Sequence, residues 1–194
     1  MMISRDRAIQ LLEKYITTEW LKLHMRESEI IMRGLAKELN ENEEEWGLSG
    51  LLHDLDFDYV DKDPKRHVIE VDKILEMESL KVGEDSTDNM YHAIKSHYED
   101  HPDIKEKRES KMDYSLAASE NLSGFLVACA LVQPDKKIKS VGVDSVIKKL
   151  KKKDFAKAVN REYIYDIEKV GVSLERFIEI ALVEMNSIAK EIGL

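Results

Sequence analysis

Residues 46–58 read WGLSGLLHDLDFD, and they carry the strongest indication of how this chain folds. From Trp46 to Leu52 the residues are apolar or small nearly all round a helix, which is typical of a helix at the centre of an all-α core. This run ends in the doublet His53-Asp54, followed by two further acids. Because a buried charge is costly unless something pairs with it, the segment either reaches the surface abruptly or faces a cation.

The composition of the 194 residues favours one all-α domain spanning 1–194. Gly (8 residues) and Pro (3 residues) are scarce, whereas Leu, Glu, Lys, Ile, Ala and Met are plentiful, as long helices with short connections require. The length suits one domain with a substantial core. We expect about eight or nine helices from the apolar periodicity and the capping residues, at 4–16, 21–39, 43–55, 66–78, 87–99, 111–132, 143–151, 154–168 and 174–192.

Charge and apolar runs exclude several classes of protein. The net charge of −9 argues against general nucleic-acid binding, because a phosphate backbone would be repelled. The lone Cys129 lies in an apolar run and is interpreted as a core residue of a protein in a reducing compartment. The longest apolar run, 124–132, is too short to span a membrane, and the N-terminus lacks the apolar core of a signal peptide. We therefore expect a cytoplasmic protein that does not bind membranes.

Helical spacing divides the six histidines into groups, because residues three or four apart share a helical face. His24, His67 and His97 align with apolar neighbours, Trp20 among those of His24, so they are expected to point inward. His92 aligns with charged residues and His101 lies in the loop EDHPD, so both are expected to face solvent. For any one inward histidine, a core imidazole bonded to a carbonyl is the alternative to a metal ligand.

Glu120 is the clearest inward carboxylate. It shares a helical face with Leu116, Ser123 and Val127, and no basic residue occurs from Ser115 to Gln133. A metal ion, or histidines from other helices, would supply the missing positive charge. Imidazole and carboxylate ligands suit Fe, Mn, Co, Ni or Zn, whereas the absence of clustered Cys argues against a structural zinc site.

The order of these residues, His24 then His53-Asp54 then a later acid, resembles the HD-domain superfamily of metal-dependent phosphohydrolases. The similarity to a bacterial and archaeal HD hydrolase subgroup extends over most of the chain, through the segments HMRESEIIMRGLAKEL, WGLSGLLHDLDFD, RHVIEVDKIL, AIKSH, ENLSGFLVACALVQP and KKDFAKAVNRE. It implies a single HD-type helical bundle. Its metal-site core would cover about 20–134, and C-terminal helices at about 140–194 would pack on that core.

The resemblance also implies a ligand set for one or two divalent transition-metal ions. The first ion would be held by the first His, the doublet and the later acid, which here are His24, His53, Asp54 and Glu120. In binuclear members two further histidines, matched here by His67 and His97, hold a second ion that Asp54 bridges to the first. Glu120 departs from the family's usual Asp. Glu binds the same cations through a longer arm, so the geometry and the metal preference stay open.

The implied activity is hydrolysis of a small phosphate ester, a nucleotide among the candidates, by metal-activated water. Asp54 would take part in catalysis, and Glu99 or Asp58 would protonate the leaving oxygen. Cations are needed to bind substrate phosphate; the candidates, each with the alternative of a solvated surface charge, are Arg26, Arg66, Lys152, Lys157 and Arg161. The nine lysines of residues 136–157 could attract a polyanion or form polar helix faces.

Two other functions stay open at this point. Some HD-fold proteins hold a mixed-valent di-iron centre that activates oxygen on a small polyol or phosphonate. A non-catalytic module that binds a nucleotide or a metal is the third reading, favoured by the departure at Glu120. The sequence leaves the substrate, the native metal and the oligomeric state undefined.

Overall fold

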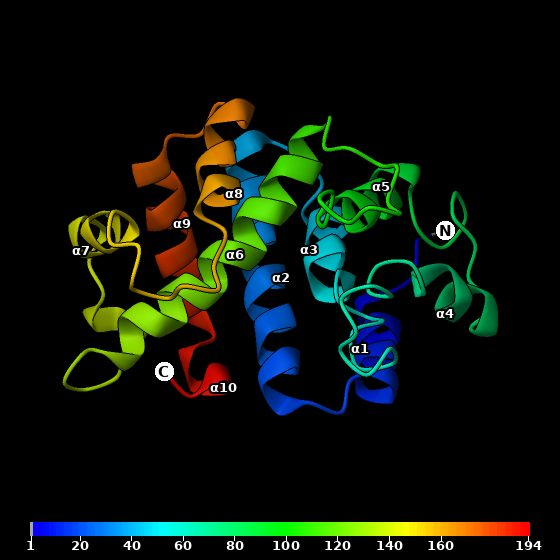
Figure 1. Cartoon of the computed structure of the whole chain (residues 1–194), viewed down its shortest axis with the longest axis horizontal. Coiled ribbons are helices and arrows are strands. Elements are labelled where there is room, and N and C mark those ends of the chain that lie inside the picture. Colours follow the sequence, from blue (N-terminus) through cyan, green and yellow to red (C-terminus); the bar gives the residue numbers. More distant parts are fainter. Residues whose placement is uncertain (1) are drawn as a thin grey trace.

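The two longest helices, α2 (Glu19–Leu39) and α6 (Lys111–Leu131), cross at the centre of the molecule (Figure 1). The computed structural model describes residues 2–194, which form ten α-helices and two short 3-10 helices and contain no β-strand. Helix α6 starts with a capping box, in which Ser110 and Asp113 satisfy each other's backbone N–H groups. Helix α2 stops at Asn40, which adopts the left-handed conformation with φ 56°.

The other helices pack on the two sides of this pair. Figure 1 shows one group near the N-terminus and another near the C-terminus. The first group is α1 (Arg5–Tyr15), α3 (Glu43–Leu52), α4 (Val71–Met77) and α5 (Asp88–Ser96). The second is the 3-10 helix η1 (Ile138–Ser140), α7 (Val143–Leu150), α8 (Arg161–Tyr165), the 3-10 helix η2 (Asp166–Val170), α9 (Leu174–Ser187) and α10 (Ala189–Ile192).

The all-α fold expected from the sequence is confirmed, but several helix boundaries were wrong. The helix expected at 66–78 begins only at Val71, after a series of turns. The helix expected at 154–168 begins only at Arg161. The loop before it bends through a positive φ at Ala156, and the Arg161 guanidinium donates to four carbonyl groups of 150–159, which hold the loop in place. The helix expected at 174–192 is interrupted at Ile188, which separates α9 from α10.

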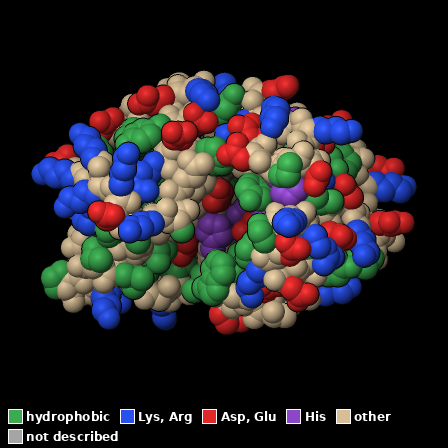
Figure 2. All heavy atoms as spheres, in the orientation of Figure 1, with side chains coloured by type: hydrophobic (Ala, Val, Ile, Leu, Met, Phe, Trp, Pro, Cys, Tyr) green, Lys and Arg blue, Asp and Glu red, His purple; other side chains and the backbone are tan. Residues whose placement is uncertain are grey.

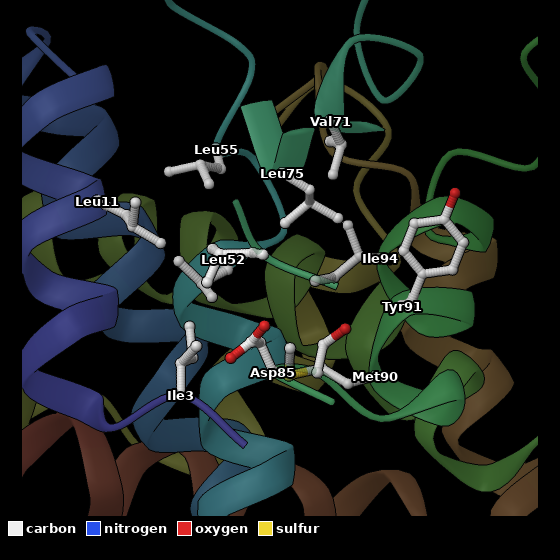
Figure 3. A pocket seen from close by; sticks show the side chains of 12 residues that line it. Ile3, Leu11, Leu52, Leu55, Val71, Leu75, Asp85, Met90, Tyr91 and Ile94 are labelled. Atoms are coloured by element: carbon white, nitrogen blue, oxygen red, sulfur yellow. The ribbon is translucent and has the colours of Figure 1, made fainter. Parts of the chain in front are cut away.

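A continuous apolar core joins both groups of helices through α2, α3 and α6. Under α1, α3 and α5 it contains a small cavity of about 30 Å³, which side chains such as Leu11, Leu52 and Ile94 surround (Figure 3). That volume is close to the space of a single water molecule, and the lining is almost wholly apolar. Among the described residues, no helix is long and apolar enough to cross a bilayer.

Candidate metal centre

The doublet His53-Asp54 follows directly on the end of α3, where the chain turns away from the helix axis. Helix α3 starts at Asn42, whose side chain accepts hydrogen bonds from the backbone N–H groups of residues 44 and 45. Gly50 lets α3 approach α2 closely, because a Cβ at Gly50 would lie 2.7 Å from the carbonyl carbon and oxygen of Ser28. This close packing brings the doublet next to His24 of α2.

Asp54 lies at the centre of four imidazole rings. Its Oδ2 atom is 3.9 Å from Nε2 of His24 and 3.5 Å from Nε2 of His53. Its Oδ1 atom is 3.2 Å from Nε2 of His67 and 3.4 Å from Nε2 of His97. Within residues 2–194, the side chains that could hold a metal ion form two groups, and Asp54 belongs to both. Asp54 is therefore the residue that the two groups have in common.

The other ring nitrogen of each histidine fixes its tautomer. Nδ1 of His53 is 2.8 Å from the carbonyl oxygen of Gly50, and Nδ1 of His97 is 2.7 Å from that of Ile94. Because a carbonyl can only accept, both Nδ1 atoms carry the proton. A neutral ring protonated on Nδ1 exposes a lone pair on Nε2, which is the atom facing Asp54.

The tautomer of His24 is fixed in the same way, here by the hydroxyl group of a serine. Ser123 of α6 donates its proton to the carbonyl oxygen of Glu120, so its oxygen is left to accept from Nδ1 of His24 at 3.0 Å. The Nε2 atoms of His24 and His53 then face each other at 3.2 Å with no proton between them. A cation between two such lone pairs would stabilise the arrangement, so the donor set fits a divalent metal.

Asp56 supports the fourth ring and was not recognised from the sequence. Its Oδ1 atom accepts a hydrogen bond of 2.9 Å from Nδ1 of His67, and its side chain is completely buried. Carboxylates in this position orient metal-binding histidines and raise their basicity. The only signal in the sequence was the spacing of two residues between Asp54 and Asp56, which does not reveal a contact with His67.

The pKa values of these histidines and of Asp54 are shifted in ways that favour the binding of a cation. Burial lowers the pKa of His24 and lowers that of His53 to about 3, so both rings are neutral. Burial opposes ionisation of Asp54, but the histidines around it hold its pKa well below the usual range. Burial would also lower the pKa of His67, yet hydrogen bonds with Asp54 and Asp56 raise it to about 10. A metal on His67 would therefore displace a proton.

Glu120 lines the same pocket as Asp54 but belongs to neither compact group. Its Oε1 atom accepts a hydrogen bond from the side chain of Asn121, whose own oxygen accepts from the backbone N–H of Asn160 at 2.9 Å. Burial, followed by the nearby charge of Asp54, raises the pKa of Glu120 well above its usual value. The structure thus places this carboxyl group beside the site without bringing it into contact with the histidines.

The pocket over these groups has a volume of about 390 Å³. Its floor contains Asp54, His67 and His97, and its walls include the rings of Phe57 and Tyr98. Figure 2 shows histidine side chains at the bottom of a hollow in the middle of the molecule. A pocket of this size is typical of small-molecule sites.

Two residues expected to take part in catalysis are not placed in this pocket. The guanidinium of Arg26 pairs with Glu29 and with Glu191 of α10. Glu99 binds Arg108 through its carboxylate, which accepts from the backbone and the side chain of that residue. Both charges are therefore engaged by other side chains, and the role of Arg26 and Glu99 with the substrate stays a prediction.

Asp58, the other candidate acid, stabilises the start of α2. Its carboxylate accepts from the backbone N–H groups of Thr17 and Thr18, each at 2.8 Å, and from both hydroxyls. Burial by itself would raise the pKa of Asp58, but these hydrogen bonds lower it to about 2. An acid that strong does not hold a proton for a leaving group near neutral pH.

The expected phosphate-binding cations also lie outside the pocket lining. Arg66 pairs with Glu70, Lys157 pairs with Asp154, and Lys152 is exposed. Arg161 is occupied by backbone carbonyl groups, as described above. Figure 2 shows basic side chains gathered on the flank that carries α7, apart from the central hollow.

Two orientations inferred from the sequence, one from a loop position and one from helical spacing, were wrong. His101 is only 4% exposed, because its ring packs near Tyr98 and its Nδ1 atom accepts from the backbone N–H of Asp103. Trp20, expected on the inward face with His24, is 59% exposed, since it lies in the first turn of α2. His92 is partly exposed, as expected, with Nδ1 at 3.1 Å from a carboxylate oxygen of Asp113.

Comparison with known families identifies the family to which the chain belongs. The sequence model of the HD domain matches residues 23–120, about half of the chain. The chain therefore belongs to the HD-domain family, a family of metal-dependent phosphohydrolases that bind divalent metals through histidine and aspartate. The matched region runs from the residue before His24 to Glu120. Comparisons with curated proteins and with solved structures gave no match.

Proposed function

We propose that this protein hydrolyses small phosphate esters, nucleotides among the candidates, with two divalent ions sharing Asp54. The observation that carries the proposal is the convergence of four imidazole Nε2 atoms on the two oxygens of Asp54, which lines an open pocket together with His67 and His97. His24 and His53 would hold one ion, and His67 and His97 the other. Glu120, which lines the same pocket, would provide a further ligand. Bound there, a divalent ion lowers the pKa of coordinated water toward roughly 7 and offsets phosphoryl charge.

The chain's own residues keep these ligands in place. Each ring is held through Nδ1 by a carbonyl, a hydroxyl or the carboxylate of Asp56, so the ligands need little reorganisation when substrate binds. Phe57 and Tyr98 flank the ring of His67, with centroid distances of 5.0 and 5.7 Å. These rings limit the access of bulk water to this side of the pocket, which strengthens electrostatic interactions inside it.

The test is a screen of phosphate esters with metal-free protein that is reloaded separately with Mn, Co, Ni or Mg. We expect phosphate release with at least one metal, and its loss in Asp54→Ala and His53→Ala. Lys157→Ala is the matched control, because that side chain lies on the surface outside the pocket. Circular dichroism checks that each variant is folded.

Two results would contradict the proposal. Oxygen uptake by the iron-loaded protein, without phosphate release, would indicate oxidative chemistry at the same ligands. Protein that retains no metal and shows no activity with any added ion would indicate a non-catalytic binding module.

A further inference from the structure

The walls of the metal-site pocket contain no cation. Within the described chain, the residues that line this pocket include no Lys and no Arg. Besides Asp54 and Glu120, whose charges would be used by metal ions, the lining includes a third acid, Asp100. Phosphate groups in proteins are normally met by Arg, Lys or backbone N–H donors. Here the ions alone would have to balance the charge of the substrate.

One guanidinium, that of Arg108, packs against a residue of the pocket lining. Cζ of Arg108 is 3.7 Å from the ring centroid of Tyr163, and its Nη2 atom donates to Glu99. The Arg108 side chain is only 3% exposed. Tyr163 lines the pocket and Arg108 does not, so this guanidinium packs against a lining residue and is not itself part of the lining. The charge of Arg108 therefore gives no direct contact to a phosphoryl group.

Asp100 adds negative charge at the solvent side of the same wall. It is exposed, it lines the pocket, and one of its oxygens accepts a hydrogen bond from the hydroxyl of Tyr163. That bond fixes the carboxylate on the pocket side of the loop after α5. A second or third phosphoryl group extending away from the metal ligands would approach a like charge, which is unfavourable.

We propose that the substrate carries a single phosphoryl group, and that Asp100 and the cation-free wall exclude polyphosphates. This inference rests on the proposed function and narrows its substrate class. Two ions would bring four positive charges, of which the carboxylates of Asp54, Glu120 and the buried Asp56 offset three. A single phosphate monoester already carries more negative charge than the remainder, so each further phosphoryl group would stay without a partner.

The test compares inorganic phosphate with tripolyphosphate as ligands of metal-loaded protein, by isothermal titration calorimetry, and AMP with ATP as substrates. Metal content is measured after each titration, so that removal of ions by the polyphosphate is detected. We expect phosphate to bind at least tenfold more tightly than tripolyphosphate. Asp100→Asn, which keeps an acceptor for Tyr163, is expected to reduce that ratio several-fold, because it should strengthen the binding of tripolyphosphate much more than that of phosphate.

Asp103→Asn is the matched control, because Asp103 is an exposed acid of the same loop that does not line the pocket. Equal binding of phosphate and tripolyphosphate to the wild-type protein would overturn the inference, as would an equal response to both substitutions. If no ester is hydrolysed but phosphate is still preferred over tripolyphosphate, the proposed function fails while the charge selectivity stands. If ATP and AMP are hydrolysed equally well, the function stands and the selectivity fails.

Discussion

Substitution of Asp56 by Asn tests whether the buried carboxylate behind His67 supports metal binding. The change keeps the shape of the side chain and an oxygen that accepts from Nδ1, but it removes the charge from a fully buried contact of 2.9 Å. A hydrogen bond to a charged group contributes about 1.5–3 kcal/mol and a neutral one about 0.5–1.5 kcal/mol. The midpoints of these ranges differ by about 1.3 kcal/mol, which corresponds to nearly tenfold in affinity, at the lower end of the effects known for such supporting residues.

The assay is isothermal titration of metal-free protein with Mn²⁺ or Co²⁺. Only the ion on His67, His97 and Asp54 should bind about tenfold more weakly in Asp56→Asn, because that residue contacts His67 alone among the ligands. Ser123→Ala is the matched control, since it removes the Nδ1 partner of His24 and should weaken the other ion instead. Unchanged affinity in a folded Asp56→Asn protein would refute the reasoning, and so would equal weakening of both ions.

Three further outcomes follow from burial and charge. Burial raises the pKa of Glu27 from 4.5 to about 8, so the folded state loses stability as pH rises from about 4.5 to 8, by at most about 5 kcal/mol. Glu27→Gln should therefore raise the unfolding free energy at pH 8 and change it little at pH 4. Denaturant titrations that show the same gain in unfolding free energy at both pH values would contradict this. Metal affinity should rise with pH from 6 to 8, because the raised pKa of His67 lets protons compete with the ion; pH-independent titrations would exclude this competition. Leu11→Ala, beside the small apolar cavity, should lower the unfolding free energy by about 2–5 kcal/mol with the metal content unchanged, and loss of metal from the still-folded variant would show that the cavity and the site are coupled.

The sequence predicted those parts of the site that depend on helical periodicity. His24, His67 and His97 were placed inward by their apolar neighbours, and the structure brings all three to the doublet at the end of α3. Periodicity accounts for His24, which lies within α2, because one apolar stripe of that helix faces the shared core. His67 lies in the turns before α4 and His97 directly after α5, so their inward positions depend on how the chain turns at these helix ends. Contacts at helix ends and in loops also explain the errors at Trp20 and His101.

Partners of charged side chains could not be predicted from position in the sequence. Arg26 lies two residues after His24, yet its guanidinium pairs with Glu191, which is 165 residues away in the chain. Asp58 follows the doublet closely but holds the start of α2 instead of facing the pocket. Such contacts depend on tertiary packing, which brings distant helices together and leaves no local pattern.

The start of α8 could not be predicted for a similar reason. The segment from 154 to 160 has a composition compatible with a helix, but Arg161 binds its carbonyl groups in a non-helical loop. That loop delivers Asn160 to Asn121, next to Glu120. Tertiary hydrogen bonds thus override local propensity at a wall of the pocket.

The central claim is that side chains from separate helices share one or two divalent ions at Asp54. Anomalous diffraction from crystals of the Mn²⁺- or Co²⁺-loaded protein tests it most directly. We predict a peak about 2.0–2.2 Å from an Asp54 oxygen and from Nε2 atoms of the surrounding histidines. Metal peaks located only at other carboxylates, with none at Asp54, would contradict the account.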